Sequence, residues 1–185
     1  MIIIGITGTI GAGKGTIVDI LKERGFAHFS ARDFIVEKII EAKLPINRDT
    51  MTSMGNLLRK NHTPSYVLEN LYNKAKESGQ NSVLESVRNP KEIEFLRKQE
   101  NFILLAVTAD VEKRYQRILL RKTVTDNVSF ETFKANEERE MQSNDINSQN
   151  LRLCIEMADY VVDNSGTIEE LKEKVEEIWE KIIKK

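Results

Sequence analysis

The chain has 185 residues, 40% of them hydrophobic and 31% charged, a balance that indicates one domain with a sizeable core and excludes disordered or fibrous proteins. Its 28 basic residues nearly cancel its 29 acidic residues, so no overall positive charge favours nucleic acid or an anionic membrane as a partner. The single cysteine, Cys154, excludes an internal disulfide and a cysteine-rich zinc site, and its helical spacing with apolar residues predicts a buried side chain. Because the chain has neither a basic, signal-like start nor an apolar run of membrane-spanning length, we expect a soluble cytoplasmic protein.

Short apolar patterns typical of strands alternate with helical patterns along the chain. This order predicts an α/β fold of three layers, with a sheet of about five parallel strands and helices on both faces. The first strand is expected at 2–7, followed by a glycine-rich turn at 8–13 and a helix at 16–24 that Gly25 ends. We expect a single domain that spans residues 1–185.

The turn after the first strand carries the motif of a phosphate-binding loop. Its G-x-x-x-x-G-K pattern and the two residues after it read Gly8-Thr9-Ile10-Gly11-Ala12-Gly13-Lys14-Gly15-Thr16. Glycine permits positive-φ turns that aim backbone N–H groups at phosphate oxygens, and lysine supplies a fixed positive charge. The bare pattern occurs by chance in roughly one chain in twenty, but a buried strand before it and an amphipathic helix after it identify a phosphate loop. The residues expected to bind the nucleotide phosphates are Gly8, Gly11, Ala12, Gly13, Lys14, Gly15 and Thr16.

The G-K-G-T ending of this motif resembles the loop of adenylate kinase and related nucleoside monophosphate kinases. In those enzymes the hydroxyl that usually binds Mg²⁺ directly after the lysine is missing. The resemblance implies a P-loop kinase fold with ATP and Mg²⁺ as cofactors. It also implies that Thr16 contacts phosphate and that Mg²⁺ is held largely through waters.

The second strand and helix, expected at 26–30 and 33–42, bring a candidate acceptor site with them. Asp33 ends a Ser-Ala-Arg-Asp segment similar to the Ser-x-Gly-Asp segment at the acceptor site of the monophosphate kinases. Arg32 replaces the glycine of that segment, and Val36 stands where an arginine is usual. These two differences leave the mode of acceptor recognition open.

Residues 46–80 show only helical patterns, broken by a turn at 63–65, and we interpret them as a small helical insertion that binds the acceptor. Arg59 on this insertion is expected to be an exposed surface arginine, with a role at the acceptor site as the alternative. His28 and His62 stand alone without metal-ligand spacing and are assigned no chemistry.

The third strand, expected at 82–85, ends in Glu85-Ser86-Val87-Arg88. Open parallel sheets bind ligands at the carboxyl ends of their strands, and the monophosphate kinases carry Asp-Gly-x-x-Arg at this place. The resemblance implies that Glu85 orients the waters of Mg²⁺ and that Arg88 holds the acceptor phosphate with its planar guanidinium. A strand-end salt bridge is the alternative role for Arg88.

A basic helix follows the fourth strand, which is expected at 102–108. The spacing of Arg114, Arg117 and Arg121 places them on one face of that helix. The segment resembles the start of the lid in adenylate kinases and dephospho-CoA kinases, which implies a short lid region at 111–145. In that resemblance Arg117 and Arg121 cover the phosphates. Arg139 is either a further lid arginine or part of a surface salt bridge.

The last strand and helix, expected at 159–163 and 167–184, are joined by a loop that resembles the tail of dephospho-CoA kinases. The resemblance implies that this loop packs on the adenine of ATP and that backbone groups near Gly166 read the base. Asn164 and Thr167 also serve as ordinary turn and helix-capping residues. The Ser-Val-Arg-Asn-Pro-x-Glu stretch instead resembles phage-type deoxynucleoside monophosphate kinases and archaeal adenylate-kinase-related proteins.

Together these patterns favour an ATP-dependent phosphotransferase that moves the γ-phosphate to a nucleoside monophosphate or a similar small phosphorylated acceptor. The expected catalytic residues are Lys14, Asp33, Arg88, Arg117 and Arg121, and the expected metal contacts are Thr16 and Glu85. One alternative is dephospho-CoA kinase, with Asp33 as the base for a ribose hydroxyl. A second is a nucleotide-dependent regulatory ATPase without a small acceptor. The sequence leaves the acceptor and the oligomeric state open.

Overall fold

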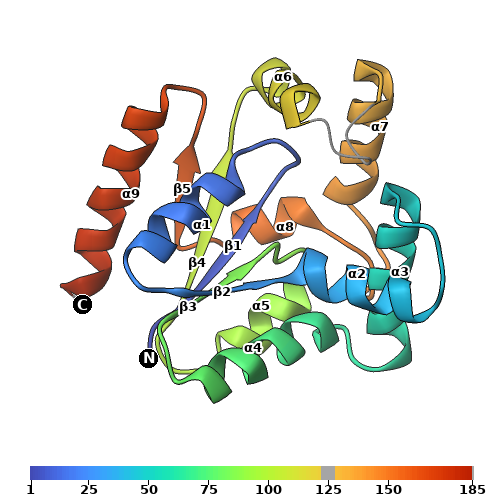
Figure 1. Ribbon diagram of the computed structural model, residues 1–185, viewed down its shortest axis with the longest axis horizontal. Coiled ribbons are helices and arrows are strands. Elements are labelled where there is room, and N and C mark those ends of the chain that lie inside the picture. Colours follow the sequence, from blue (N-terminus) through green and yellow to red (C-terminus); the bar gives the residue numbers. More distant parts are fainter. Residues whose placement is uncertain (122–127, 185) are drawn as a thin grey trace.

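The computed structural model describes residues 1–121 and 128–184, in which the strands form one parallel sheet (Figure 1). The strands are β1 (Ile3–Gly8), β2 (Ala27–Ser30), β3 (Ser82–Glu85), β4 (Phe102–Thr108) and β5 (Tyr160–Asp163). Their order in the sheet is β2-β3-β1-β4-β5, and all neighbours run parallel. Every strand lies within one residue of its predicted bounds, and the expected α/β architecture is confirmed.

The helices fill the intervals between the strands as predicted. They are α1 (Lys14–Glu23), α2 (Ala31–Glu41), α3 (Arg48–Asn61), α4 (Tyr66–Ser78), α5 (Pro90–Leu96), α6 (Val111–Arg121), α7 (Phe130–Met141), α8 (Leu151–Glu156) and α9 (Ile168–Ile183). Helix α2 begins two residues earlier than predicted, because the Ser30 hydroxyl caps it by accepting the Asp33 N–H at 3.1 Å. Helix α1 also begins two residues early, since Gly13 in the left-handed conformation ends the turn.

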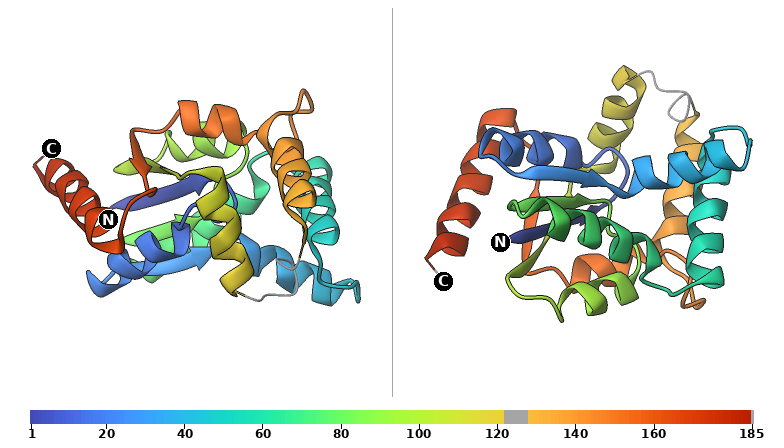
Figure 2. Two further views of the ribbon diagram at one scale, coloured as in Figure 1. Left: turned by 90° about the horizontal axis from the view of Figure 1, so that it is seen from above. Right: turned by 60° about the horizontal axis from the view of Figure 1, so that its bottom comes forward.

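Helices lie on both faces of the sheet (Figure 2), and an apolar cluster of buried side chains covers each face. Helices α1 and α9 pack on one face, and α4, α5 and α8 pack on the other. Ile3 and Ile4 of β1 point into opposite layers, which is the period-two pattern of a central strand buried on both sides. Cys154 of α8 is fully buried, as predicted, and burial raises the pKa of its thiol, so it is a core residue rather than a nucleophile.

Residues 46–80 are helical as predicted, but their two helices pack against different partners. Helix α4 buries Val67, Leu68 and Leu71 in the layer beneath the sheet. Helix α3 instead packs on α2, where Met54 meets Ile39 in a separate small cluster. Figure 1 shows that helices α2, α3 and α7 lie at the end of the molecule opposite α9, beyond the carboxyl ends of the strands.

Candidate active site

The loop between β1 and α1 has the conformation that phosphate binding requires. Gly8, Gly11 and Gly13 have φ angles of 136°, 75° and 97°, values that glycine adopts readily and other residues rarely adopt. A Cβ atom on Gly8 would lie 2.2 Å from the carbonyl oxygen of Val107, and one on Gly13 would lie 2.2 Å from Asn164 Nδ2. Glycine is therefore required here both by the backbone angles and by the close approach of neighbouring chain segments.

The first turn of α1 faces this loop. Its capping residue, Gly13, has no side chain, and no acidic residue stands in the turn. Gly15 and Thr16 lie in the same turn, and a Cβ atom on Gly15 would meet no heavy atom within 4 Å. Because the first N–H groups of a helix have no partner within it and carry the positive end of its dipole, this turn is suited to bind phosphate.

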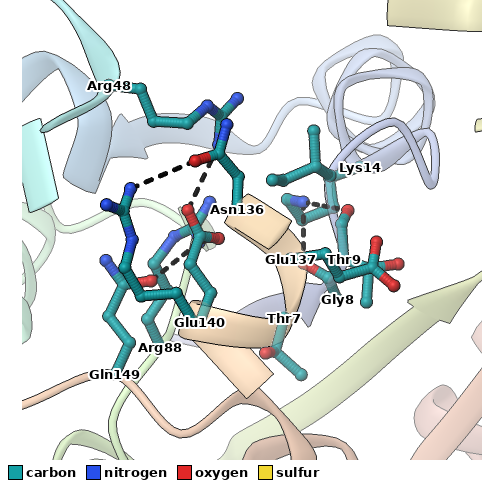
Figure 3. Close-up of polar contacts among 12 residues, drawn as sticks. Thr7, Gly8, Thr9, Lys14, Arg48, Arg88, Asn136, Glu137, Glu140 and Gln149 are labelled. Atoms are coloured by element: carbon teal, nitrogen blue, oxygen red, sulfur yellow. Dashed lines mark hydrogen bonds and ion pairs between the residues drawn. The ribbon is translucent and has the colours of Figure 1, made fainter. Parts of the chain in front are cut away.

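Lys14 lies against the phosphate loop (Figure 3). Its Nζ donates to the carbonyl oxygens of Gly8 and Thr9, at 2.8 Å each. Burial, together with the nearby charge of Arg88, lowers the pKa of Lys14 from 10.5 to about 7. An anion bound beside this amine favours its charged form, so the site gains electrostatic energy when phosphate binds.

The segment after β3 is anchored to β1. The backbone N–H groups of Ser86 and Val87 both donate to the Ile6 carbonyl, at 2.9 and 3.0 Å, and the Thr7 hydroxyl donates to the Val87 carbonyl at 2.8 Å. Ser86 has a φ of 74°, a strained value for a residue with a side chain. Glycine adopts this angle without strain, so the turn after β3 places a serine in a conformation typical of glycine.

Glu85 receives a hydrogen-bonding partner that sequence inspection missed. His28 Nε2 lies 3.0 Å from Glu85 Oε2, across the β2–β3 pair. Burial acts to raise the pKa of Glu85, but the hydrogen bond from His28 and the charge of Lys14 outweigh it, so the pKa lies below its usual value. The spacing of His28 and Glu85 along the sequence carries no signal of this contact, because pairing of the strands creates it.

Arg88 is held by two side chains from other parts of the chain (Figure 3). Its Nη1 contacts the Glu140 carboxylate of α7 and donates to Gln149 Oε1 at 3.0 Å. Glu140 also accepts a hydrogen bond from Arg48 Nη1 of α3, at 3.2 Å. Arg48, Glu140 and Gln149 stand in no sequence motif that predicts a role at this site. One sequence pattern could have indicated the role of Glu140. Glu137 and Glu140 are three residues apart and share a face of α7, and each pairs with a site arginine, Arg114 or Arg88.

A fully buried ion pair stands behind Arg88. Arg59 Nε of α3 donates to Glu92 Oε1 at 2.9 Å, and their side chains are 1% and 0% exposed. Glu92 Oε2 accepts the backbone N–H groups of Arg88 and Asn89, at 2.8 and 3.0 Å. The expectation that Arg59 is an exposed surface residue is therefore wrong. Its partner, Glu92, lies 33 residues away in the sequence. Glu92 also completes the capping box of α5, so a glutamate at that position gives no sign of a second contact with Arg59.

The three arginines of α6 share a helix face but have different surroundings. Arg114 is buried, pairs with Glu137 and donates to the Ile10 carbonyl of the phosphate loop at 3.2 Å. Arg117 donates to the Asn164 carbonyl at 2.8 Å. Arg121, at the end of the helix, lines the same cavity as Lys14.

The predicted lid region spans α6 and α7, and its residues 122–127 lie outside the described residues. Arg139 of α7 pairs with Asp49 of α3 at 2.9 Å, with both side chains exposed. Of its two predicted roles, the structure supports the surface salt bridge. Such exposed pairs contribute at most about 1 kcal/mol to stability.

The loop between β5 and α9 touches the phosphate loop through Asn164, whose Nδ2 donates to the Ala12 carbonyl at 2.8 Å. Thr167 and Glu170 form a capping box at the start of α9, which confirms the capping role of Thr167. Gly166 directly precedes Thr167, and a Cβ atom there would collide with the Glu170 carboxylate. The predicted base-reading loop therefore lies next to the phosphate loop.

These groups surround a cavity of about 150 Å³ at the carboxyl end of the sheet. Gly11, Lys14, Glu85, Arg88 and Arg121 all line it, so five of the predicted site residues meet in one place. Its remaining lining comes from the phosphate loop, α2, α3, α7 and nearby loops, and includes Ile10, Ser30, Arg32, Ile35, Arg48, Met51, Arg59, Glu140 and Gln149. Asp33 is exposed on the first turn of α2 and is not part of the lining.

No group of three or more His, Cys, Asp and Glu side chains within residues 1–121 and 128–184 is arranged to hold a metal ion. In the same part of the chain, no helix has the length and apolar character needed to cross a membrane.

Comparison with known proteins places this chain in a family. A family model described as an AAA domain matches residues 4–145. A UPF0200 protein of Sulfurisphaera tokodaii is 30% identical over 185 residues, which cover 98% of this chain and 97% of that protein. A UPF0200 protein of Methanococcus vannielii is 27% identical over 187 residues, which cover 99% of this chain and 97% of that protein.

Among solved structures, a shikimate kinase from Acinetobacter baumannii in complex with shikimate has the same fold. Its TM-score is 0.61 at 17% identity, and the match covers 100% of this chain and 94% of that chain. The expected P-loop kinase fold is thereby confirmed. The chain therefore belongs to the UPF0200 family and carries an AAA domain with the fold of a P-loop kinase.

Proposed function

We propose that the protein is an ATP-dependent phosphotransferase that moves the γ-phosphate of ATP to a nucleoside monophosphate or a similar small phosphorylated acceptor. One observation carries the proposal: Lys14 of the phosphate loop, Arg88 after β3 and Arg121 of α6 line a single cavity. Phosphoryl transfer requires donor and acceptor to meet in line while cations neutralise the transferred group. The cavity offers cations for both molecules in one place.

Each cation has a separate task in this proposal. Lys14 and the backbone N–H groups of the phosphate loop bind the β- and γ-phosphates of ATP. Arg117 adds a cation beside the loop, and its buried Nη1 has no hydrogen-bond partner among the described residues, which fits an anionic ligand. Arg121 covers the transferred group and Arg88 holds the acceptor phosphate, so the rate gain comes from positioning and electrostatic stabilisation.

Mg²⁺ would be held through waters by Thr16 and Glu85. Glu85 fits this task because its carboxylate is partly exposed, lies beside Lys14 and has a pKa below the usual value, so it is ionised at neutral pH. A bound Mg²⁺ neutralises charge on the phosphate oxygens. His28 holds the Glu85 carboxylate in place through its Nε2.

A coupled assay of ADP release tests the proposal across a panel of ribo- and deoxyribonucleoside monophosphates. We expect turnover that depends on at least one acceptor. The K14A variant should lose at least about a hundredfold in kcat/KM, because one electrostatic contact to the reacting phosphate is worth that much. Lys22→Ala, which removes an exposed lysine from the same helix, is the matched control and should keep the wild-type rate.

Two other results would replace the proposal. Turnover with dephospho-CoA alone would favour that substrate, although Asp33, the base this alternative needs, lies outside the cavity lining. Slow ATP hydrolysis that no acceptor in the panel stimulates would favour a regulatory ATPase.

A further inference from the structure

Glu140 lies where an anionic ligand of the cavity would be expected (Figure 3). Its side chain is 3% exposed, and its two carboxylate oxygens are divided between Arg88 and Arg48. The arginines come from the β3–α5 segment and from α3, so the carboxylate joins the wall of the sheet to the helical region that contains α3. Both arginines and Glu140 line the cavity that also contains Lys14.

Two guanidinium groups that converge on one carboxylate form an anion site. A carboxylate and a phosphate present the same kind of acceptor oxygens to an arginine fork. Burial alone raises the pKa of Glu140, but the charges of Arg88 and Arg48 outweigh burial, so its pKa lies below the usual value and the group is ionised. Gln149 accepts a further hydrogen bond from Arg88 and fixes the orientation of the guanidinium independently of Glu140.

We propose that Glu140 is an internal occupant of the acceptor's anion site and competes with the anionic group of the acceptor for Arg48 and Arg88. This inference rests on the proposed function, which it extends by naming Arg48 and Glu140 as specificity-determining residues. A ligand must offer these arginines more than the single charge of Glu140, so the site selects dianionic phosphomonoesters over singly charged carboxylates. Glu140 thereby weakens the binding of every anion and excludes the weaker ones.

Binding of inorganic phosphate, measured by calorimetry on the full chain, tests the inference without any catalytic turnover. In Glu140→Gln the amide keeps the shape of the side chain but removes its charge. We expect phosphate to bind at least about tenfold more tightly, because both guanidinium groups lose their competing carboxylate; a tenfold gain corresponds to about 1.4 kcal/mol. Unchanged or weaker phosphate binding in this variant overturns the proposal.

Glu137→Gln is the matched control, because Glu137 also lies on α7 and also pairs with a buried arginine, Arg114, but is not part of the cavity lining. Glu137→Gln removes the same charge as Glu140→Gln and also breaks an ion pair with an arginine. It should nevertheless leave phosphate affinity within twofold of the wild type. An equal gain in Glu137→Gln would make the effect one of net charge and would refute competition. The gain should also vanish in the double variant Glu140→Gln/Arg88→Met, and its persistence there would place the anion elsewhere, for example at the phosphate loop.

If Glu140→Gln fails to fold, Glu140→Asp tests the proposal instead. The shorter side chain keeps the charge but cannot span both arginines, so phosphate should still bind more tightly than in the wild type, and equal or weaker binding overturns the proposal. If phosphate affinity does not rise in Glu140→Gln, acceptor-dependent ADP release by the wild-type protein still supports the phosphotransferase. A protein that transfers no phosphate can still show the gain in phosphate affinity.

Discussion

The phosphate loop and the arginine cluster around Glu140 line the same cavity but are built in different ways. The loop is a run of consecutive residues whose shape depends on positive φ angles at glycines. The arginine cluster joins residues that are 52, 61 and 92 positions apart, through contacts of Glu140 and Gln149 with Arg88 and Arg48. A local backbone requirement shapes the first region, and tertiary ion pairs shape the second.

This difference has a consequence for how the two regions tolerate change. The loop is held by backbone conformation and by close approach of Asn164 and Val107, so adding a single methyl group disturbs it. The cluster is held by charges that must be compensated once they are buried. If one charge is removed there, its partner stays buried without a compensating charge, which costs free energy of unfolding.

The largest effect is expected from Arg59→Met, which breaks the buried ion pair that holds the backbone of Arg88. The variant leaves Glu92 buried without its cation, and breaking such a pair lowers the free energy of unfolding by about 3–5 kcal/mol. The backbone that carries Arg88 is bound to Glu92, so the KM for the acceptor should rise while the KM for ATP stays within about twofold, a change below 0.5 kcal/mol. Urea unfolding and steady-state kinetics below the melting temperature measure both effects.

Arg97→Met is the control for this prediction, because Arg97 also joins two parts of the chain by pairing with Asp159, but at 40% and 31% exposure. We expect a loss of no more than about 1 kcal/mol. Comparable losses in the two variants would show that burial of the Arg59–Glu92 pair has no special weight.

A smaller effect is expected on the loop side, from Gly13→Ala. Its φ of 97° and the 2.2 Å approach of Asn164 Nδ2 leave no room for a Cβ atom, so the variant should lose about 1–3 kcal/mol in the free energy of unfolding. Gly15→Ala, two residues later, is the matched control, since its Cβ would meet nothing within 4 Å. That control should be stabilised by about 0.4–1 kcal/mol. Chemical denaturation compares the pair, and equal stabilities would refute the strain argument.

The smallest effect is a gain, from Ser86→Gly. Ser86 holds a φ of 74° at the end of β3, and glycine adopts this angle without strain. We expect the free energy of unfolding to rise by about 1 kcal/mol, the lower end of the cost of a strained backbone position. A lower melting temperature in differential scanning calorimetry would contradict this, because it would mean that the Ser86 hydroxyl stabilises the fold by more than the backbone strain destabilises it.

Much of the fold follows from local patterns. The apolar run of β1, the glycines after it and the alternation of strands with helices each predict their element to within one or two residues. Lys14, Glu85, Arg88 and Arg121 line one cavity, and parallel strands place the segments that carry the first three at one edge of the sheet. The error at Arg59 has an equally physical origin: a charged residue on an amphipathic helix looks exposed until a distant partner is found for it.

The sequence by itself determined the phosphate loop, because positive φ angles and close packing demand glycine at fixed spacings and leave a pattern in consecutive residues. Only the tertiary structure decided which charges are paired. His28 with Glu85, Arg59 with Glu92, and Glu140 with Arg48 and Arg88 are joined across the fold. A Coulombic contact depends on distance in space and on burial, and neither quantity is written in the spacing of residues along the chain.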